Sequence, residues 1–502
     1  MLEAWKKLQN GSDIRGVAME GIEGQPVNLT EDKVEVIAKA FVMWLSEKLH
    51  KKTEELTVAV GMDSRLTGPA LKRAVLQGLT EAGVQAVDCG MASTPAMFMT
   101  TVLSGCECDG SIMLTASHLP FNRNGLKFFT QEGGLEKGDI TALLEKAEAG
   151  DLPVSSETGR VRELNFIRIY AADLVSKIRK ATGEERPLDG MKIVVDAGNG
   201  AGGFYAEQVL KPLGAVTNGS QFLNPDGHFP NHIPNPEDKS AMEAIQKAVL
   251  DNGADFGIVF DTDVDRAGAV DRNGREINRN RIIALIAAIA IEEHPGATIV
   301  TDSITSSGLK TFIEQKLGGV HHRFKRGYKN VINEAIRLNE QGTYTPVAIE
   351  TSGHGALKEN YFLDDGAYLI AKILIKMAAL RKEGKHIDQL ISELEEPAES
   401  KEYRFNLLCD DFKDYGLDVI QRLKAYSDTV PGWQPEPENY EGIRIRCDRA
   451  SGDGWFLLRM SLHDPLMPLN IESNTAGGTA EILERLKPFL KQFSELDTSS
   501  LK

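Results

Sequence analysis

The sequence has few cysteines and no long apolar run. Its five cysteines are scattered, and the one C-x-C pair, Cys106 and Cys108, has no second pair at zinc-site spacing. A disulfide framework is therefore not expected, and a reducing cytoplasm fits the composition. The longest apolar run, 282–291, is too short to cross a bilayer, and residues 1–10 lack the apolar core of a signal peptide. We expect a cytoplasmic protein with no membrane partner.

Positive charge is scarce relative to negative charge. The formal net charge is −16, whereas binding to nucleic acid needs a basic face, so we expect no nucleic-acid partner. An anionic substrate must then be bound by a local group of arginine and lysine side chains, because the overall field does not attract it. The hydrophobic content of 41% and the charged content of 26% are typical of a globular protein, and the length predicts several domains.

Several widespread enzyme motifs are missing too. G-x-G-x-x-G occurs at 198–203, but no acidic residue follows where a dinucleotide fold needs one, so the glycines are better explained by a tight turn. No Walker A motif is present, and Ser117 lies in neither G-x-S-x-G nor S-x-x-K. These absences argue against a dehydrogenase, a P-loop kinase and the common acyl-transfer enzymes.

A unit of one strand and one helix occurs three times along the sequence. At 56–65, 191–196 and 297–303 an apolar strand reaches an Asp, and a helical pattern and a glycine follow. Strands that alternate with helices predict βαβ units in mixed, largely parallel sheets. After a break near 400, the sequence predicts strands at 403–408, 442–447 and 455–462 and a helix at 478–493.

The predicted fold class is therefore three doubly wound, mixed-sheet α/β domains followed by a smaller C-terminal α+β domain. The expected domain ranges are 1–160, 161–275, 276–396 and 397–502. In such sheets ligands gather at the carboxyl ends of strands, so the polar loops that follow apolar strands are the candidate sites.

The first such loop follows the apolar run that begins at Ser111. The run ends in Thr115-Ala116-Ser117-His118 and is closed by a proline, which predicts a buried strand that brings the Ser117 hydroxyl to a surface. An ordinary strand-to-helix turn is the alternative for a single serine.

The second loop follows another apolar run and holds Asp261, Asp263 and Asp265. An EF-hand also begins D-x-D-x-D, but its sixth and twelfth positions, a Gly and a Glu, are Arg266 and Arg272 here. Alternating acids can simply line the solvent face of a strand, yet three clustered carboxylates repel one another unless a cation neutralises them. Hard carboxylate oxygens predict Mg²⁺. A serine oxygen with such a loop suggests phosphoryl transfer through a phosphoserine.

Other polar residues are suggestive only in combination. Glu350, Ser352 and His354 form a loop that could bind sugar hydroxyls, and Arg459 and Ser461 suit a phosphate. Lys127 could be a charge partner or a proton carrier, or simply a surface lysine. Arg15, in Asp13-Ile14-Arg15-Gly16, is weak evidence by itself.

With these loops in this order, the chain resembles the α-D-phosphohexomutases, the phosphoglucomutase/phosphomannomutase superfamily, over essentially its whole length. Residues 115–120 resemble the family's phosphoserine loop, T-A-S-H-N-P, and residues 261–266 resemble its metal loop, D-G-D-x-D-R. The segment that ends at His354 is similar to the family's sugar loop, G-E-x-S-G-H, and residues 459–465 are similar to its phosphate loop, R-x-S-x-T-E-P. Asp13-Ile14-Arg15-Gly16 and Gly61-Met62-Asp63-Ser64-Arg65 match two further family signatures.

The resemblance implies four domains around a central cleft and the interconversion of hexose 1-phosphate and hexose 6-phosphate. Hexose 1,6-bisphosphate would be the bound intermediate and activator, and the protein would be a monomer or a dimer. The implied catalytic residues are Ser117, Lys127, His354 and Arg15, and the implied Mg²⁺ ligands are Ser117, Asp261, Asp263 and Asp265. The implied substrate-binding residues are Arg266, Lys325, Glu350, Ser352, Arg459, Ser461 and His463.

Some positions depart from the family pattern. Leu119 replaces Asn, His463-Asp464 replace Thr-Glu, and Arg326 stands where smaller residues are frequent. Thr351 occupies the variable position of the sugar loop and indicates neither a glucosamine nor a mannose/glucose mutase. A phosphomannomutase/phosphoglucomutase is the first hypothesis. The alternatives are a phosphoglucosamine mutase, a serine-dependent sugar phosphatase and a degenerate binding protein on the same scaffold.

Overall fold

A computed structural model of the protein describes residues 1–461 and 464–501. Its contacts divide the chain into two compact units. The first unit holds Met1–Asn278 and Ser352–Ile387, and the second holds Arg279–Thr351 and Asp388–Lys502. The chain therefore leaves the first unit, returns to it just after Thr351, and leaves it again.

The first sheet of the first unit is mixed. Its strand order is β1-β2-β6-β5-β3-β4-β8, with β7 paired to β6; β5, β3, β4 and β8 are parallel, and β6 returns antiparallel to β5. The strands are β1 (Gln9–Asn10), β2 (Asp13–Val17), β3 (Thr57–Met62), β4 (Gln85–Met91), β5 (Gly110–Leu114), β6 (Arg123–Thr130), β7 (Gly133–Gly134) and β8 (Val161–Glu163). Each residue of β5 is buried, as its apolar sequence predicts.

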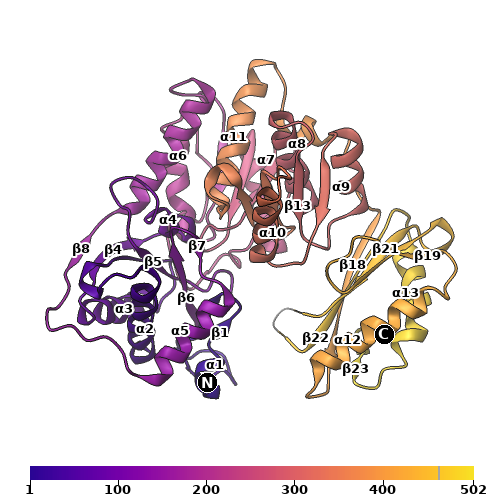
Figure 1. The fold of residues 1–502 in the computed structure, drawn as a ribbon. Helices are drawn as coiled ribbons and strands as arrows, with labels where there is room; N and C mark the ends of the chain where they lie inside the picture. The colour runs from indigo at the N-terminus through magenta and orange to yellow at the C-terminus, as the bar shows by residue number, and fades with distance from the viewer. Residues whose placement is uncertain (462–463, 502) are drawn as a thin grey trace. The chain divides into compact units, whose positions relative to one another are not determined.

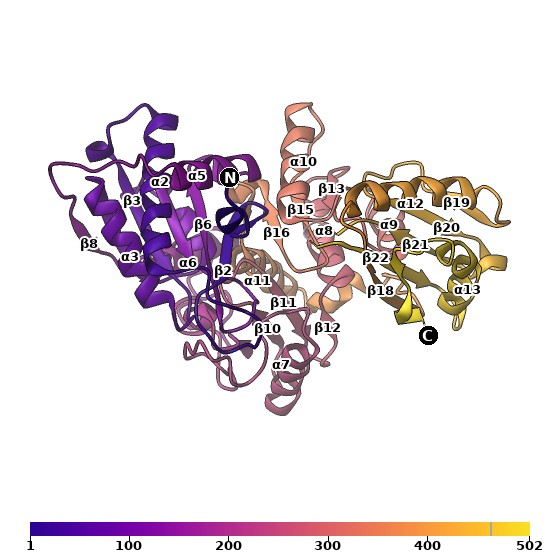
Figure 2. The ribbon, with the colours of Figure 1, turned by 90° about the horizontal axis from the view of Figure 1, so that it is seen from below.

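Helices complete this α/β layer. They are α1 (Glu3–Lys6), α2 (Glu31–Leu49), α3 (Gly68–Glu81), α4 (Thr94–Met99), α5 (Lys137–Ala149) and α6 (Phe166–Thr182). Apolar faces of α2, α3 and α5 share one core with β3, β5 and β6, and α2 contacts both of its neighbours (Figure 2). The Thr30 hydroxyl accepts from the Lys33 amide and begins α2.

The second sheet of the first unit has the order β12-β11-β10-β9 and places β9 parallel to β10. Its strands are β9 (Ile193–Asp196), β10 (Phe256–Phe260), β11 (Ala267–Asp271) and β12 (Glu276–Ile277). A π-helix spans Tyr205–Leu210, α7 (Lys239–Asn252) packs on β9 and β10, and α11 (Gly366–Lys382) contacts α6. The glycine-rich run is a tight turn, as predicted, in which the Gly200 amide donates to the Ala197 carbonyl at 2.7 Å. A Cβ on Gly200 would lie 2.6 Å from the Thr262 carbonyl oxygen, so the turn requires glycine there.

The returning segment of the first unit is a hairpin that precedes α11. Its strands, β16 (Gly355–Leu357) and β17 (Leu363–Asp364), are antiparallel. The hairpin is joined to the start of β11, because the Ala267 amide donates to the Gly353 carbonyl at 3.3 Å. Gly353 has a φ of +93°, and a Cβ there would lie 2.8 Å from the Ala267 carbonyl oxygen, so only glycine fits this junction.

In the second unit, β13 (Thr298–Thr301) lies between the parallel strands β14 (Val320–Arg323) and β15 (Val347–Ile349). The accompanying helices are α8 (Asn280–Glu293), α9 (Ser307–Thr311), a π-helix at Phe312–Lys316 and α10 (Tyr328–Glu340). The apolar run 282–291 lies in α8 and is buried. Within residues 1–461 and 464–501, no helix combines the length and the apolarity that a bilayer crossing requires.

The C-terminal part of the second unit is an antiparallel sheet with two longer helices, α12 (Phe412–Ser427) and α13 (Gly478–Leu490), which share one apolar core with it (Figure 1). The strand order is β19-β20-β21-β22-β18-β23. The strands are β18 (Glu399–Leu407), β19 (Trp433–Pro435), β20 (Ile443–Cys447), β21 (Gly454–Leu458), β22 (Leu466–Ser473) and β23 (Leu496–Asp497). The predicted fold class, three α/β domains and a C-terminal α+β domain, is confirmed, whereas the predicted strand at 455–462 already ends at Leu458.

Candidate active site

Ser117 lies just beyond the carboxyl end of β5, as the sequence predicts. Its φ of 50° is in the left-handed region, and its amide donates to the Thr115 hydroxyl at 2.9 Å. The side chain is almost fully buried. A non-glycine residue in this conformation is held by its surroundings, which marks the loop as a candidate functional element.

Arg65 fixes the backbone of this loop through hydrogen bonds to its carbonyl oxygens. Its guanidinium is buried and donates to four carbonyl oxygens: those of Ser117, Leu119 at 2.6 Å, Pro120 at 2.8 Å and Arg123 at 2.9 Å. We call this arrangement the arginine cradle. Asp63 anchors the cradle, since it lies 3.4 Å from Arg65 Nε and also accepts from the Thr115 hydroxyl at 2.7 Å. Burial raises the pKa of Asp63 to about 6 although Arg65 opposes the shift.

The acidic loop follows β10 and lies directly against Ser117. Ser117 Oγ donates to Asp261 Oδ2 at 3.0 Å. Thr94, at the start of α4, ties the same loop to the first sheet, since its hydroxyl and its amide donate to the side chain and the carbonyl of Asp263. The serine oxygen and the acidic loop therefore meet, although they lie far apart in the sequence.

The donor set fits a divalent cation. One carboxylate oxygen from each of Asp261, Asp263 and Asp265 lies within 4.8 Å of the others, and all three residues are buried. In the part of the chain that the structure describes, Asp263 Oδ1 and Asp265 Oδ1 are buried and accept no hydrogen bond. Burial and the neighbouring carboxylates raise the pKa of Asp261 well above its usual range. Buried carboxylate oxygens of this kind are the ligands that Mg²⁺ prefers.

Two cations border the acidic loop. Lys127, on β6, forms ion pairs with Asp265 and, at 3.5 Å, with Asp263. Arg266 donates from Nε to Asp261 Oδ2 at 3.1 Å and from Nη2 to Ser117 Oγ at 2.8 Å. Burial alone would raise the pKa of Asp265, but Lys127 and its other cationic neighbours hold it below the usual range. Both side chains balance the acids, and Arg266 also reaches the serine oxygen.

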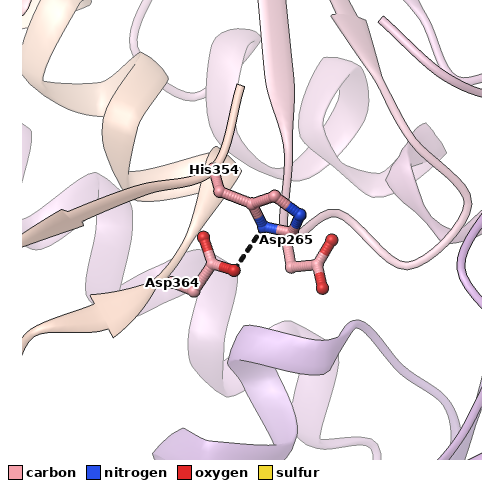
Figure 3. Close-up of side chains that lie close together, drawn as sticks. All are labelled: Asp265, His354 and Asp364. Carbon is pink, nitrogen blue, oxygen red and sulfur yellow. Dashed lines mark hydrogen bonds and ion pairs between the residues drawn. The ribbon is translucent and has the colours of Figure 1, made fainter. Parts of the chain in front are cut away.

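His354 joins the site from the hairpin. Its Nδ1 is hydrogen-bonded to the carboxylate of Asp364, and its backbone pairs with that of Arg266. Figure 3 shows the imidazole flanked by the carboxyl groups of Asp364 and Asp265. Burial alone would lower the pKa of His354, but these two carboxylates raise it above the usual value.

Arg15 and His118 lie at the edge of the serine loop, and only Arg15 carries a charge there. Arg15, on β2, pairs with Asp13 at 2.9 Å. His118 Nδ1 lies 2.6 Å from Arg266 Nη2. Burial, and then the charges of Arg266 and Arg15, lower the pKa of His118 to about 2, so this imidazole is neutral at physiological pH.

The remaining predicted residues divide between the two units. Ser352 belongs to the first unit, and in the second Glu350 accepts from the Gly327 amide at 2.7 Å while Lys325 Nζ lies 5.9 Å from the Phe324 ring. Thr351 is turned to Asp302, to which both its amide and its hydroxyl donate. The residue at the variable position of the sugar loop is thus held by a contact within the second unit.

The predicted phosphate loop begins at the end of β21. Arg459 is buried and lies 3.8 Å from Glu441, which also accepts from the Ser303 hydroxyl and, at 3.2 Å, from the Arg326 amide. The Ser461 hydroxyl accepts from the Asp464 amide at 3.3 Å. His463 lies outside the described residues.

Sequence reasoning missed three supporting residues. Arg65 and Asp63 were recognised as part of a motif, but nothing in the motif indicated that they hold the serine loop. Asp364 carries no signal of its own in the sequence, since it stands beside Asp365, which is the N-cap of α11 and accepts from the Tyr368 amide at 2.8 Å.

A buried serine oxygen beside an acidic cation loop and a cationic border define a phosphoryl-transfer site on an α/β scaffold. Models of the phosphoglucomutase/phosphomannomutase alpha/beta/alpha domains I, II and III match residues 6–151, 168–274 and 278–397. The chain therefore belongs to the phosphoglucomutase/phosphomannomutase family, which confirms the resemblance.

Individual relatives agree with this assignment. The chain is 32% identical over 435 residues to a phosphomannomutase/phosphoglucomutase of Pseudomonas putida, covering 86% of both chains. It is 29% identical over 481 residues to a phosphoglucomutase of Neisseria gonorrhoeae, covering 95% of both. A crystal structure of a phosphoglucomutase/phosphomannomutase family protein from Burkholderia thailandensis matches with a TM-score of 0.79 at 27% identity, covering 98% of both chains.

Proposed function

We propose that this protein is a phosphomannomutase/phosphoglucomutase, which interconverts hexose 1-phosphates and hexose 6-phosphates. The observation that carries the proposal is the position of Ser117 Oγ, 3.0 Å from Asp261 Oδ2 and 2.8 Å from Arg266 Nη2. A hydroxyl in this setting is placed to carry a phosphoryl group between a cation-binding carboxylate and a guanidinium.

The reaction would begin with the phosphoryl group on Ser117. The free hydroxyl of the bound sugar phosphate attacks phosphorus, the bond to Ser117 Oγ breaks, and hexose 1,6-bisphosphate is formed. After the bisphosphate is bound in the opposite orientation, Ser117 Oγ takes back the other phosphoryl group. Bound Mg²⁺, held by Asp261, Asp263, Asp265 and an oxygen on Ser117, would neutralise charge on the transferring group.

Side chains of the protein supply the proton transfer and further positive charge. We assign His354 to accept and return the proton of the reacting hydroxyl, because the imidazole lies beside the acidic loop and histidine is the side chain that most often acts as a general acid and base. Lys127, Arg15 and Arg266 supply positive charge around the serine loop. Arginine is unsuited to proton transfer because it stays protonated.

Substrate recognition would come from the sugar and phosphate loops. Carboxylate and hydroxyl groups of Glu350 and Ser352 suit sugar hydroxyls, and Lys325 suits an anionic oxygen. Arg459, Ser461 and His463 would bind the phosphate that is not being transferred. Arg459 is the strongest of these ligands, since a guanidinium can bind phosphate through two parallel hydrogen bonds.

Two measurements test this function. After incubation with glucose 1,6-bisphosphate, intact mass should show one added phosphate, and peptide mapping should place it on Ser117 rather than on Ser111 of the same segment. Ser117→Ala should then stay folded and unphosphorylated and should lose most of its turnover.

Coupled assays with glucose, mannose and glucosamine 1-phosphates, together with detection of free phosphate, identify the reaction. A mutase yields hexose 6-phosphate, and the preferred sugar separates a phosphomannomutase/phosphoglucomutase from a phosphoglucosamine mutase. Inorganic phosphate as the main product, or phosphate on another residue, would contradict the proposal.

A further inference from the structure

The hairpin β16–β17 brings an acid beside His354. His354 precedes β16, and the antiparallel register places Asp364 opposite Ala356. The Asp365 amide donates to the Gly355 carbonyl at 3.2 Å, which closes the same end of the hairpin. The pairing of the two side chains is therefore built into the strand register and does not depend on a flexible loop.

The hairpin is also fixed to the acidic loop. The Gly366 amide donates to the Val264 carbonyl at 3.1 Å, and a Cβ on Gly366 would lie 2.7 Å from the Arg266 carbonyl carbon. Together with the backbone bridge between Arg266 and His354, these contacts hold the imidazole at a set position beside Asp265. A side-chain contact is what fixes the rotation of such a ring.

Asp364 supplies that contact. Its carboxylate is buried, with 7% of the residue exposed, and it accepts from His354 Nδ1. Nε2 lies on the other side of the ring, away from Asp364 (Figure 3). A carboxylate at Nδ1 keeps a proton on that nitrogen whether the imidazole is neutral or charged, so Nε2 is the nitrogen whose proton can be exchanged.

We propose that Asp364 is a positioning residue for the mutase reaction, because it orients His354 and reserves Nε2 for proton exchange with the sugar hydroxyl. The inference rests on the proposed function. In the forward step the hydroxyl proton passes to Nε2 while phosphorus moves from Ser117 Oγ to the sugar oxygen, and the proton is returned in the second transfer. Asp364 does not itself exchange a proton with the sugar, because its contact is with Nδ1, as for the orienting acid of a histidine dyad.

The chain offers a matched control in the neighbouring residue. Asp365 is also a buried carboxylate, but it accepts from the Tyr170 hydroxyl at 2.6 Å, Asn360 Nδ2 at 3.0 Å and the Tyr368 amide. Asp365→Asn should therefore lower stability without changing either kcat or KM by more than about twofold, because it leaves the histidine contact intact.

Kinetics of the full-length, phosphorylated protein test the proposal with glucose 1-phosphate and mannose 1-phosphate. Asp364→Asn should lower kcat by roughly 10- to 100-fold with little change in KM, since it removes an orienting partner and no substrate contact. In a His354→Gln background the same substitution should cause no further loss. An unchanged kcat, or an equal loss in both backgrounds, would overturn the proposal.

A spectroscopic measurement keeps this test separate from the proposed function. With ¹⁵N-histidine labelling and His354→Gln for assignment, the wild type and Asp365→Asn should show a protonated, hydrogen-bonded Nδ1 on His354. Asp364→Asn should lose that signature, and a retained signature would refute the assignment even if activity fell. A wild type without mutase activity would instead refute the proposed function.

Discussion

The arginine cradle beneath Ser117 gives a prediction whose size can be worked from the contacts. Arg65 reaches four carbonyl oxygens of the segment 117–123 through its two terminal nitrogens. Lysine keeps the charge opposite Asp63 but replaces a planar fork with a single ammonium. Arg65→Lys therefore should lose about two of the four bonds.

Each hydrogen bond from a charged donor contributes roughly 1.5–3 kcal/mol, so Arg65→Lys should lower the free energy of unfolding by about 3 kcal/mol or more. Arg65→Met should cost more than Arg65→Lys, because it removes all four bonds and also leaves the buried Asp63 without its cation. The paired substitution Arg65→Met with Asp63→Asn should recover part of this loss, since no uncompensated charge then remains. Urea unfolding monitored by circular dichroism measures all three.

Activity provides the second readout. Because the cradle holds the loop that carries Ser117, kcat of Arg65→Lys should fall while the protein is still folded in buffer. Arg73→Lys is the control, as Arg73 is exposed on α3 and should change stability by less than about 0.5 kcal/mol. A stable, fully active Arg65→Lys variant would refute the idea that the cradle fixes the serine loop.

Three further predictions concern charge in the site. Asp263→Asn should abolish metal-dependent turnover without unfolding the protein, and full activity of the wild type in chelator would exclude the cation site. Arg459→Ala should lower kcat/KM by roughly ten- to a hundredfold, the loss of a contact of about 1.5–3 kcal/mol, and should release bisphosphate; unchanged kinetics would remove Arg459 from the phosphate site. Mg²⁺ should bind more tightly when Ser117 is phosphorylated, and equal affinities of the two forms by titration calorimetry would contradict this.

The sequence sufficed to single out the candidate reactive groups because each follows a buried strand. Ser117 and the three acidic residues stand directly after apolar runs, and parallel strands bring such positions to one edge of a sheet. Arg65 and Asp364, which support the serine loop and His354, could not be found in this way. The role of Arg65 depends on which carbonyls a distant loop turns toward it, and that of Asp364 depends on a hairpin register, neither of which a local pattern encodes.

Sequence reasoning also missed β22, a strand whose sequence signal is weakened by a proline. β22 lies between β18 and β21, yet it contains Pro468 near its beginning. Proline cannot donate to a strand ladder, so its presence argues against a central strand. Here the Pro468 carbonyl still accepts from the Arg459 amide at 3.2 Å, which joins β22 to the first residue of the phosphate loop. A residue that weakens the sequence signal for a strand is thus hydrogen-bonded to Arg459, for which we propose a role in phosphate binding.

The charges around Ser117 explain why phosphate and cation should bind together. When all three are ionised, Asp261, Asp263 and Asp265 place three negative charges within 4.8 Å of one another, and Arg266 and Lys127 supply two positive ones. Phosphorylation adds a charge of roughly −1.5 to −2 beside Asp261 and removes the hydroxyl proton that Ser117 donates to it. A divalent cation restores the original balance, so each group lowers the electrostatic cost of binding the other, and by linkage the coupling is equal in both directions.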